Sequence, residues 1–217
     1  MPDWRHKIDN REDPTHPYSF YIGRQCPGVR TFLTVFKRHG LCTKKAGTSA
    51  TIKGSETMTL GSQMRTSIHV LFVCTANICR SFLAERILKK ILRVHKIHFV
   101  KVSSAGLMDM QGAPADFKAA RLLYDKGMDG TRHRSRPLTQ ELVEWADVIL
   151  VMEEIHREEI VARYPETRDK VHLLGAFSGR GSNGDKNIKD PHGLTDYHYR
   201  TCFAEIYLAL DGLIKCI

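Results

Sequence analysis

The residues best suited to chemistry lie in one short stretch, VLFVCTANICRS, at positions 70–81. An apolar run leads directly into Cys74, and Arg80 follows six residues later. A cysteine thiolate is a strong nucleophile, and the planar guanidinium of an arginine fits two oxygens of a phosphoryl group. The spacing therefore predicts a thiol that attacks a phosphoryl group held by the arginine.

The segment between these two residues is expected to be a loop that leads from a strand into the N-terminus of a helix. Such a loop can direct several backbone N–H groups into one concavity, where the helix dipole favours an anion and a thiolate. Asn77 tolerates left-handed backbone geometry, and Ser81 is placed to donate a hydrogen bond to the thiolate. The predicted phosphate-binding loop comprises Thr75, Ala76, Asn77, Ile78, Cys79 and Ser81.

Buried strands must carry this loop. Short apolar runs predict them at residues 69–73, 98–103, 147–152 and 171–174. Because helical patterns separate these runs, the strands should pair in parallel through right-handed crossovers. We therefore expect an α/β fold with a small doubly wound, four-stranded parallel sheet sandwiched by helices. Ligands bind such sheets at the C-terminal ends of the strands, where Cys74 is expected.

The helices between the strands follow from apolar residues at helical spacing. They are predicted at residues 81–95, 114–126, 138–145, 154–163 and 195–217. Pro114 fits the start of the second helix and Thr139 the N-cap of the third, because both residue types are favoured at these positions.

Residues 1–66 differ from the rest of the chain. They show no sustained strand or helix period and hold 11 Lys and Arg against 5 Asp and Glu, so most of the net charge of +9 lies there. We predict a basic N-terminal extension at residues 1–66, largely irregular, and a catalytic domain at residues 67–217. Met64 stands just before the first strong strand and is a candidate natural start.

The composition excludes several classes of protein. With 42% hydrophobic and 26% charged residues it is typical of a soluble globular chain. No run approaches the roughly 18 apolar residues of a membrane span, and the first thirty residues lack the apolar core of a secretory signal. The six cysteines form neither a CxxC pair nor a zinc-type group with histidine. We expect a cytoplasmic protein with free thiols, no metal and no nucleic-acid partner.

The motif C-x5-R-S in CTANICRSF resembles the signature of the low-molecular-weight protein tyrosine phosphatase family, and the resemblance extends from Ser67 to Ile217. It implies that Cys74 is the nucleophile and that Arg80 binds the phosphoryl group. The family also carries a D-P motif before its last helix, here Asp190-Pro191, which makes Asp190 the implied general acid.

Three weaker correspondences accompany these motifs. Ser104 matches a family serine that orders the asparagine of the loop, and His133 matches a histidine in a supporting hydrogen-bond network. Glu153 lies where the family often has an acidic residue. Tyr197 and Tyr199 fit the rim of the pocket, phosphorylation sites or ordinary packing equally.

The sequence departs from the family pattern at three positions. Ala76 replaces a glycine, which would cost roughly 1 kcal/mol if the position needs a positive φ. Phe82 replaces a proline, and would lie near the pocket or in the core. His192 replaces an aromatic residue that packs against the ring of the substrate.

Cys79 has two possible roles. It either packs in the loop or traps oxidised Cys74 as a disulfide.

The resemblance implies hydrolysis of phosphotyrosine through a phosphocysteine intermediate, without a cofactor. The expected partner is a phosphotyrosine-bearing protein, with a tyrosine kinase as one candidate, and no oligomeric state is indicated. Three alternatives remain: an arginine-phosphate phosphatase, a thioredoxin-coupled arsenate reductase and a non-catalytic phospho-ligand binder. The apolar Ile78 disfavours the first, because that branch prefers a small polar residue there. The reductase needs a downstream cysteine relay, yet no cysteine lies between Cys79 and Cys202.

Overall fold

The sheet has four parallel strands. The computed structural model describes residues 67–179 and 184–215, so the predictions for residues 1–66 and for a start at Met64 lie outside the described residues. The strand order is β2-β1-β3-β4. The strands are β1 at Ile68–Cys74, β2 at Val100–Gly106, β3 at Val148–Val151 and β4 at Val171–Leu173.

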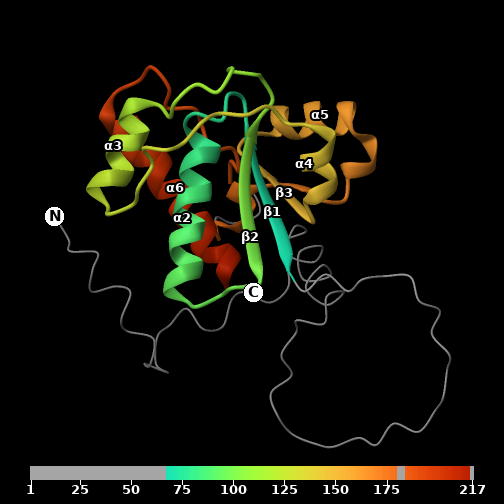
Figure 1. The fold of residues 1–217 in the computed structure, drawn as a ribbon, viewed down its shortest axis with the longest axis horizontal. Coiled ribbons are helices and arrows are strands. Elements are labelled where there is room, and N and C mark those ends of the chain that lie inside the picture. Colours follow the sequence, from blue (N-terminus) through green and yellow to red (C-terminus); the bar gives the residue numbers. More distant parts are fainter. Residues whose placement is uncertain (1–66, 180–183, 216–217) are drawn as a thin grey trace, which may run out of the picture.

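Helices cover both faces of the sheet, as predicted. In Figure 1, α2, α3 and α6 lie on one side of the strands, and α4 and α5 lie on the other. The helices are α2 at Arg80–Val94, α3 at Phe117–Asp125, α4 at Gln140–Trp145, α5 at Glu154–Arg163 and α6 at Asp196–Ile214. Two short 3₁₀ segments, η2 at Pro165–Thr167 and η3 at Leu174–Phe177, flank β4. Within the described ranges, no helix is long and apolar enough to cross a membrane.

Side-chain caps determine where α3 and α4 begin. Thr139 is the N-cap of α4 as predicted, and its side chain accepts a hydrogen bond from the backbone N–H of Leu142. Helix α3 begins at Phe117 rather than near Pro114. The reason is that Asp116, with a non-helical backbone, caps the helix by accepting from the N–H of Ala119 at 3.0 Å.

Strand β1 is buried on both faces, which explains its unbroken apolar run. Val70 and Phe72 belong to the core under α2 and α6, while Leu71 and Val73 belong to the second core under α4 and α5. Because β1 lies between β2 and β3, its C-terminal end opens between the two layers of helices. This is the position at which doubly wound sheets bind ligands.

Candidate active site

The loop from Cys74 to Arg80 is held by bonds to its carbonyl groups. Backbone N–H groups of the segment after β2 donate to three of them, and His133 Nε2 donates to the carbonyl of Asn77 at 2.6 Å. These four bonds fix the backbone of the loop, and successive peptide N–H groups of such a loop can bind an anion. The three backbone pairs are Leu107 to Cys74 at 3.0 Å, Met108 to Thr75 at 2.8 Å and Asp116 to Ile78 at 2.9 Å.

The thiol of Cys74 lies at the end of β1 and is almost fully buried. Its Sγ is 3.1 Å from Ser81 Oγ in the first turn of α2. Asn77 Nδ2 donates to the same hydroxyl at 2.9 Å. The one hydrogen of Ser81 is shared between the Ala105 carbonyl, 3.4 Å from Oγ, and Cys74 Sγ, and a thiolate is the stronger acceptor of the two. The first turn of α2 contains no acidic residue that would oppose a negative charge there.

Asn77 has the predicted left-handed backbone, with a φ of 55°. Its side chain donates to Ser104 Oγ at 2.9 Å, so the predicted contact between these two residues is present. Its Oδ1 accepts from the backbone N–H of Arg136 at 3.2 Å. Burial lowers the pKa of His133, although the bond to the Asn77 carbonyl acts in the opposite direction.

A buried carboxylate completes this network and was not predicted. Ser104 Oγ donates to Glu85 of α2, whose other carboxylate oxygen accepts from Lys89. The chain from Glu85 through Ser104 and Asn77 to Ser81 therefore ends at the thiol of Cys74. Glu85 lies on an ordinary helical face in the sequence, so only its contact with β2 identifies it.

Arg80 is buried between two acidic residues. Its Nη2 donates to Asp190 at 2.6 Å, and its Nη1 donates to Glu153 and, at 3.1 Å, to the carbonyl of Ile188. Burial alone would lower the pKa of Arg80, but Asp190 and Glu153 outweigh it and raise the pKa. Nε of Arg80 is buried and has no hydrogen-bond partner among the described residues. A buried donor of this kind is expected to meet an acceptor, and a bound phosphoryl oxygen would supply one.

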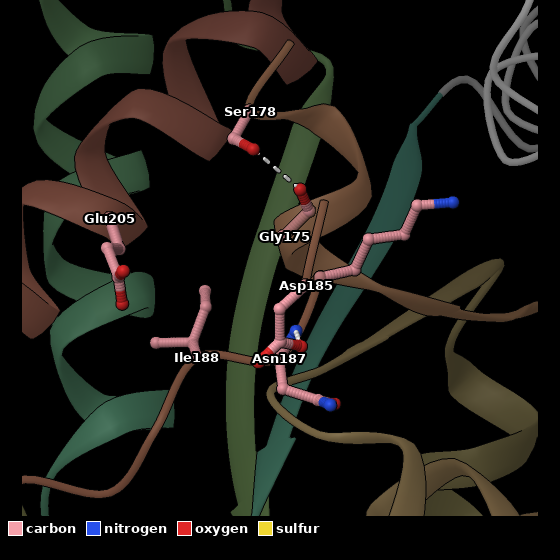
Figure 2. Close-up of a pocket in the computed structure, with 7 residues that line it drawn as sticks. Gly175, Ser178, Asp185, Asn187, Ile188 and Glu205 are labelled. Atoms are coloured by element: carbon pink, nitrogen blue, oxygen red, sulfur yellow. Dashed lines mark hydrogen bonds between the residues drawn. The ribbon is translucent and has the colours of Figure 1, made fainter. Parts of the chain in front are cut away.

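The segment before Asp190 is tied to the sheet. The N–H of Ile188 donates to the carbonyl of Met152, just after β3, at 2.7 Å. Figure 2 shows Ile188 at the edge of a small cavity between η3, segment 185–188 and Glu205 of α6, where Ser178 Oγ donates to the Gly175 carbonyl. No residue larger than glycine fits at position 175, because an added Cβ would lie 2.1 Å from the carbonyl oxygen of Lys186.

One cavity of about 260 Å³ brings the predicted catalytic residues together. Cys74, Arg80 and Asp190 all line it, although Asp190 follows Cys74 by more than a hundred positions. The remaining walls come from the loop, from the segment after β2 and from the segment after Asp190. These residues are Thr75, Ala76, Ile78, Cys79, Met108, Met110 and His192.

The three departures from the family pattern have structural accounts. Among the described residues, Ala76 is not one of those with a positive φ, so no backbone strain arises there. Phe82 is fully buried and packs on the ring of His133, with a centroid distance of 4.4 Å. His192 lines the cavity, and its Nδ1 is 3.0 Å from Oδ2 of Asp116.

Asp116 connects three parts of the site and was also not predicted. Its carboxylate accepts from Tyr199 of α6 at 2.9 Å, faces His192 and caps α3. Burial and the bond to Asp116 raise the pKa of Tyr199, which is itself buried. Tyr199 therefore supports the wall through Asp116, whereas Tyr197 is exposed.

Two further buried cysteines are Cys79, in the loop itself, and Cys202, in α6. Burial, followed by the proximity of Cys202, raises the pKa of Cys79, and burial raises the pKa of Cys202 to about 12. Both side chains are therefore thiols at neutral pH. A disulfide between Cys79 and oxidised Cys74 stays a prediction, since Cys74, Cys79 and Cys202 are all free thiols here.

Comparisons with known proteins agree with this geometry. The family model of the low molecular weight phosphotyrosine protein phosphatases matches residues 69–217. A protein-arginine-phosphatase of Geobacillus stearothermophilus is 37% identical over 146 residues, 67% of this chain and 93% of its own. A probable low molecular weight protein-tyrosine-phosphatase, EpsP of Ralstonia solanacearum, is 41% identical over 148 residues, 68% of this chain and 94% of its own. The crystal structure of a low molecular weight protein tyrosine phosphatase from T. tengcongensis superposes with a TM-score of 0.64 at 32% identity, covering 70% of this chain and all of that one.

Proposed function

Because the chain belongs to the low molecular weight phosphotyrosine protein phosphatase family, we propose that it hydrolyses phosphotyrosine in proteins through a phosphocysteine on Cys74. The thiolate attacks the phosphorus, and the bond from phosphorus to the tyrosine oxygen breaks. Arg80 and the loop N–H groups hold the charge on the phosphoryl oxygens. Asp190 gives its proton to the departing phenolate.

The second half of the reaction returns the enzyme to its starting state. Asp190, now a carboxylate, takes a proton from a water molecule, which attacks the phosphocysteine. The bond from phosphorus to sulfur breaks, the Cys74 thiolate is restored and inorganic phosphate leaves. The positive charge comes from Arg80 and the loop, so the proposed mechanism requires no metal or cofactor.

The observation that carries this proposal is the convergence of Cys74, Arg80 and Asp190 on one cavity, with Arg80 Nε buried and unpartnered within the described part of the chain. Nucleophile, anion-binding group and acid are the three parts that phosphomonoester hydrolysis by a thiol needs. All three belong to residues 67–217, and we assign the activity to this domain.

A second candidate substrate is phosphoarginine in proteins, because a 37% identical relative is named a protein-arginine-phosphatase. The cavity itself favours an aromatic substrate. Ile78, Met108 and Met110 give it apolar walls, and methionine sulfur makes favourable contacts with aromatic rings. Among the wall residues that follow Asp190, His192 is polar, and its Nδ1 is engaged by Asp116.

The test compares wild type with Cys74→Ser and Asp190→Asn on three substrates: a phosphotyrosine peptide, phosphoarginine and p-nitrophenyl phosphate. Cys74→Ser should lose all turnover. Asp190→Asn should lower kcat/KM, which reports the formation of the phosphocysteine, about 100-fold or more on phosphotyrosine but less on p-nitrophenyl phosphate, whose leaving group needs little protonation. Phosphotyrosine should have the higher kcat/KM of the two protein modifications.

Three results would refute parts of this proposal separately. A folded wild type without turnover on any substrate would remove the enzymatic function. Equal losses of kcat/KM in Asp190→Asn on both aryl phosphates would remove its role as the acid. A higher kcat/KM on phosphoarginine would change the substrate. The proposed partner is a phosphotyrosine-bearing protein, with a tyrosine kinase as one candidate.

A further inference from the structure

His156, in the first turn of α5, contacts the phosphate-binding loop. The residue is 2% exposed, and its Nε2 lies 3.0 Å from Oγ1 of Thr75. Its Nδ1 is 3.1 Å from the backbone nitrogen of Glu153, with which it forms a capping box. A histidine so placed connects α5 to the residue that follows the nucleophile.

The direction of these two bonds is determined by the backbone. A peptide N–H can only donate, so Nδ1 of His156 must be the acceptor. The hydrogen of the neutral ring is then on Nε2, and Nε2 donates to Thr75 Oγ1. Burial, and next the charge of Arg80, lower the pKa of His156 to about 4, so the ring keeps this form at neutral pH.

Thr75 is therefore left with a hydroxyl hydrogen to give. Its Oγ1 already accepts a hydrogen from His156, and Thr75 lines the same cavity as Cys74 and Arg80. A hydroxyl has one hydrogen and two lone pairs, and a fixed donor on one lone pair restricts the directions in which the hydrogen can point. The strongest acceptors that this cavity would receive are the oxygens of a phosphoryl group.

We propose that the Thr75 hydroxyl donates a hydrogen bond to a phosphoryl oxygen of the bound substrate, and that His156 is the positioning residue that orients it. This inference rests on the proposed phosphatase function and adds a side-chain donor to the backbone N–H groups of the loop. Glu153 contributes twice, since its N–H fixes the His156 ring and its carboxylate holds Arg80. The N-terminus of α5 thus supports both ends of the loop.

The test measures inorganic phosphate as a competitive inhibitor of p-nitrophenyl phosphate turnover. Thr75→Val keeps the size of the side chain and removes the donor, so the Ki for phosphate should rise roughly 10-fold, the loss expected for one hydrogen bond to a charged group. Thr75→Ser should keep a Ki near that of wild type. Thr139→Val is the matched control, because it removes a hydroxyl that caps α4 away from the cavity and should leave Ki unchanged.

The role of His156 is tested by coupling. His156→Leu should raise Ki in the wild-type background but not further in Thr75→Val, because it acts through the hydroxyl that is already absent. His156→Gln can donate and accept at similar positions, so its Ki should stay closer to that of wild type than the Ki of His156→Leu. The same coupling with Thr75→Val can be measured in His156→Gln if His156→Leu does not fold.

An unchanged Ki in Thr75→Val would overturn the proposal, as would additive effects of the two substitutions. Either result with an active wild type and an inactive Cys74→Ser would leave the phosphatase function intact. An inactive wild type would instead remove the function on which the inference rests.

Discussion

At the scale of single residues, Asn77 determines the shape of the phosphate-binding loop. Its backbone is left-handed, its carbonyl is bonded to His133, and its amide reaches Ser81 and Ser104. The backbone conformation and the side-chain bonds are separate contributions, because glycine can supply the first without the second.

We predict that Asn77→Ala and Asn77→Gly both lower kcat/KM at least 10-fold, since both remove the bonds that order Ser81 and Ser104. Asn77→Gly should be the more stable of the two by roughly 1 kcal/mol, the cost of left-handed geometry for alanine. Urea unfolding and turnover of p-nitrophenyl phosphate measure the two effects. Equal stability of the two variants would show that the backbone is not strained by alanine at this position.

The residues of the site divide into those with a local sequence signal and those without one. Cys74, Arg80 and Asn77 stand within one strand-to-helix loop, so their types and spacing predicted their positions. Asp116 and His156 act through bonds to residues more than seventy positions away, and each looks locally like an ordinary helix cap. Such pairings leave no periodic trace, and only the packed structure reveals them.

At the scale of elements, the first turn of α2 packs against residues 130–133 through the side chain of Phe82. The ring of Phe82 packs on His133, which in turn donates to the Asn77 carbonyl. Gly130 makes room for this ring, because an added Cβ would lie 2.6 Å from Phe82 Cζ. The replacement of the family's proline by Phe82 therefore depends on a small residue at position 130.

Gly130→Ala should destabilise the protein by about 1–3 kcal/mol, the usual cost of overpacking a core, and should lower kcat/KM by displacing His133. In a Phe82→Leu background the same substitution should cost less, because the shorter side chain leaves space for the methyl group. Urea unfolding of the two single variants and the double variant gives the coupling. Additive effects would mean that position 130 tolerates a Cβ independently of Phe82.

The strands and helices were predictable where their signals are local. The apolar run of β1 and the helical spacing of α5 are continuous local patterns, and both elements occur where they were predicted. The start of α3 was not, because the carboxylate of Asp116 outweighs the preference of Pro114 for a first helical turn. Parallel pairing of the strands was predicted from their alternation with helices, whereas the strand order and the close fit of Phe82 to Gly130 came from the structure.

At the scale of the whole molecule, buried titratable groups define the pH range of stability. Burial is the largest cause that lowers the pKa of His133, His156 and His172, and that of His156 falls to about 4. Burial acts in the opposite direction on the acids Tyr199 and Cys202, whose pKa values are raised. All five groups are therefore held in their neutral forms by the fold.

The free energy of unfolding should consequently be highest between about pH 6.5 and 9 and should fall on both sides. Below the ordinary histidine pKa of 6.5, the unfolded chain binds protons that the buried rings refuse, so stability is lost as the pH falls toward 4. Above the ordinary thiol pKa of 9.0, the unfolded chain releases protons that buried Cys202 retains, so stability is lost again.

Urea titrations at pH 4.5, 7.5 and 9.5 measure both slopes. The free energy of unfolding of His156→Gln should change less than that of wild type between pH 7.5 and 4.5, and by the same amount between pH 7.5 and 9.5. An equal acid slope in that variant would mean that His156 is not held neutral, and the direction of its bond to Thr75 would then be wrong as well.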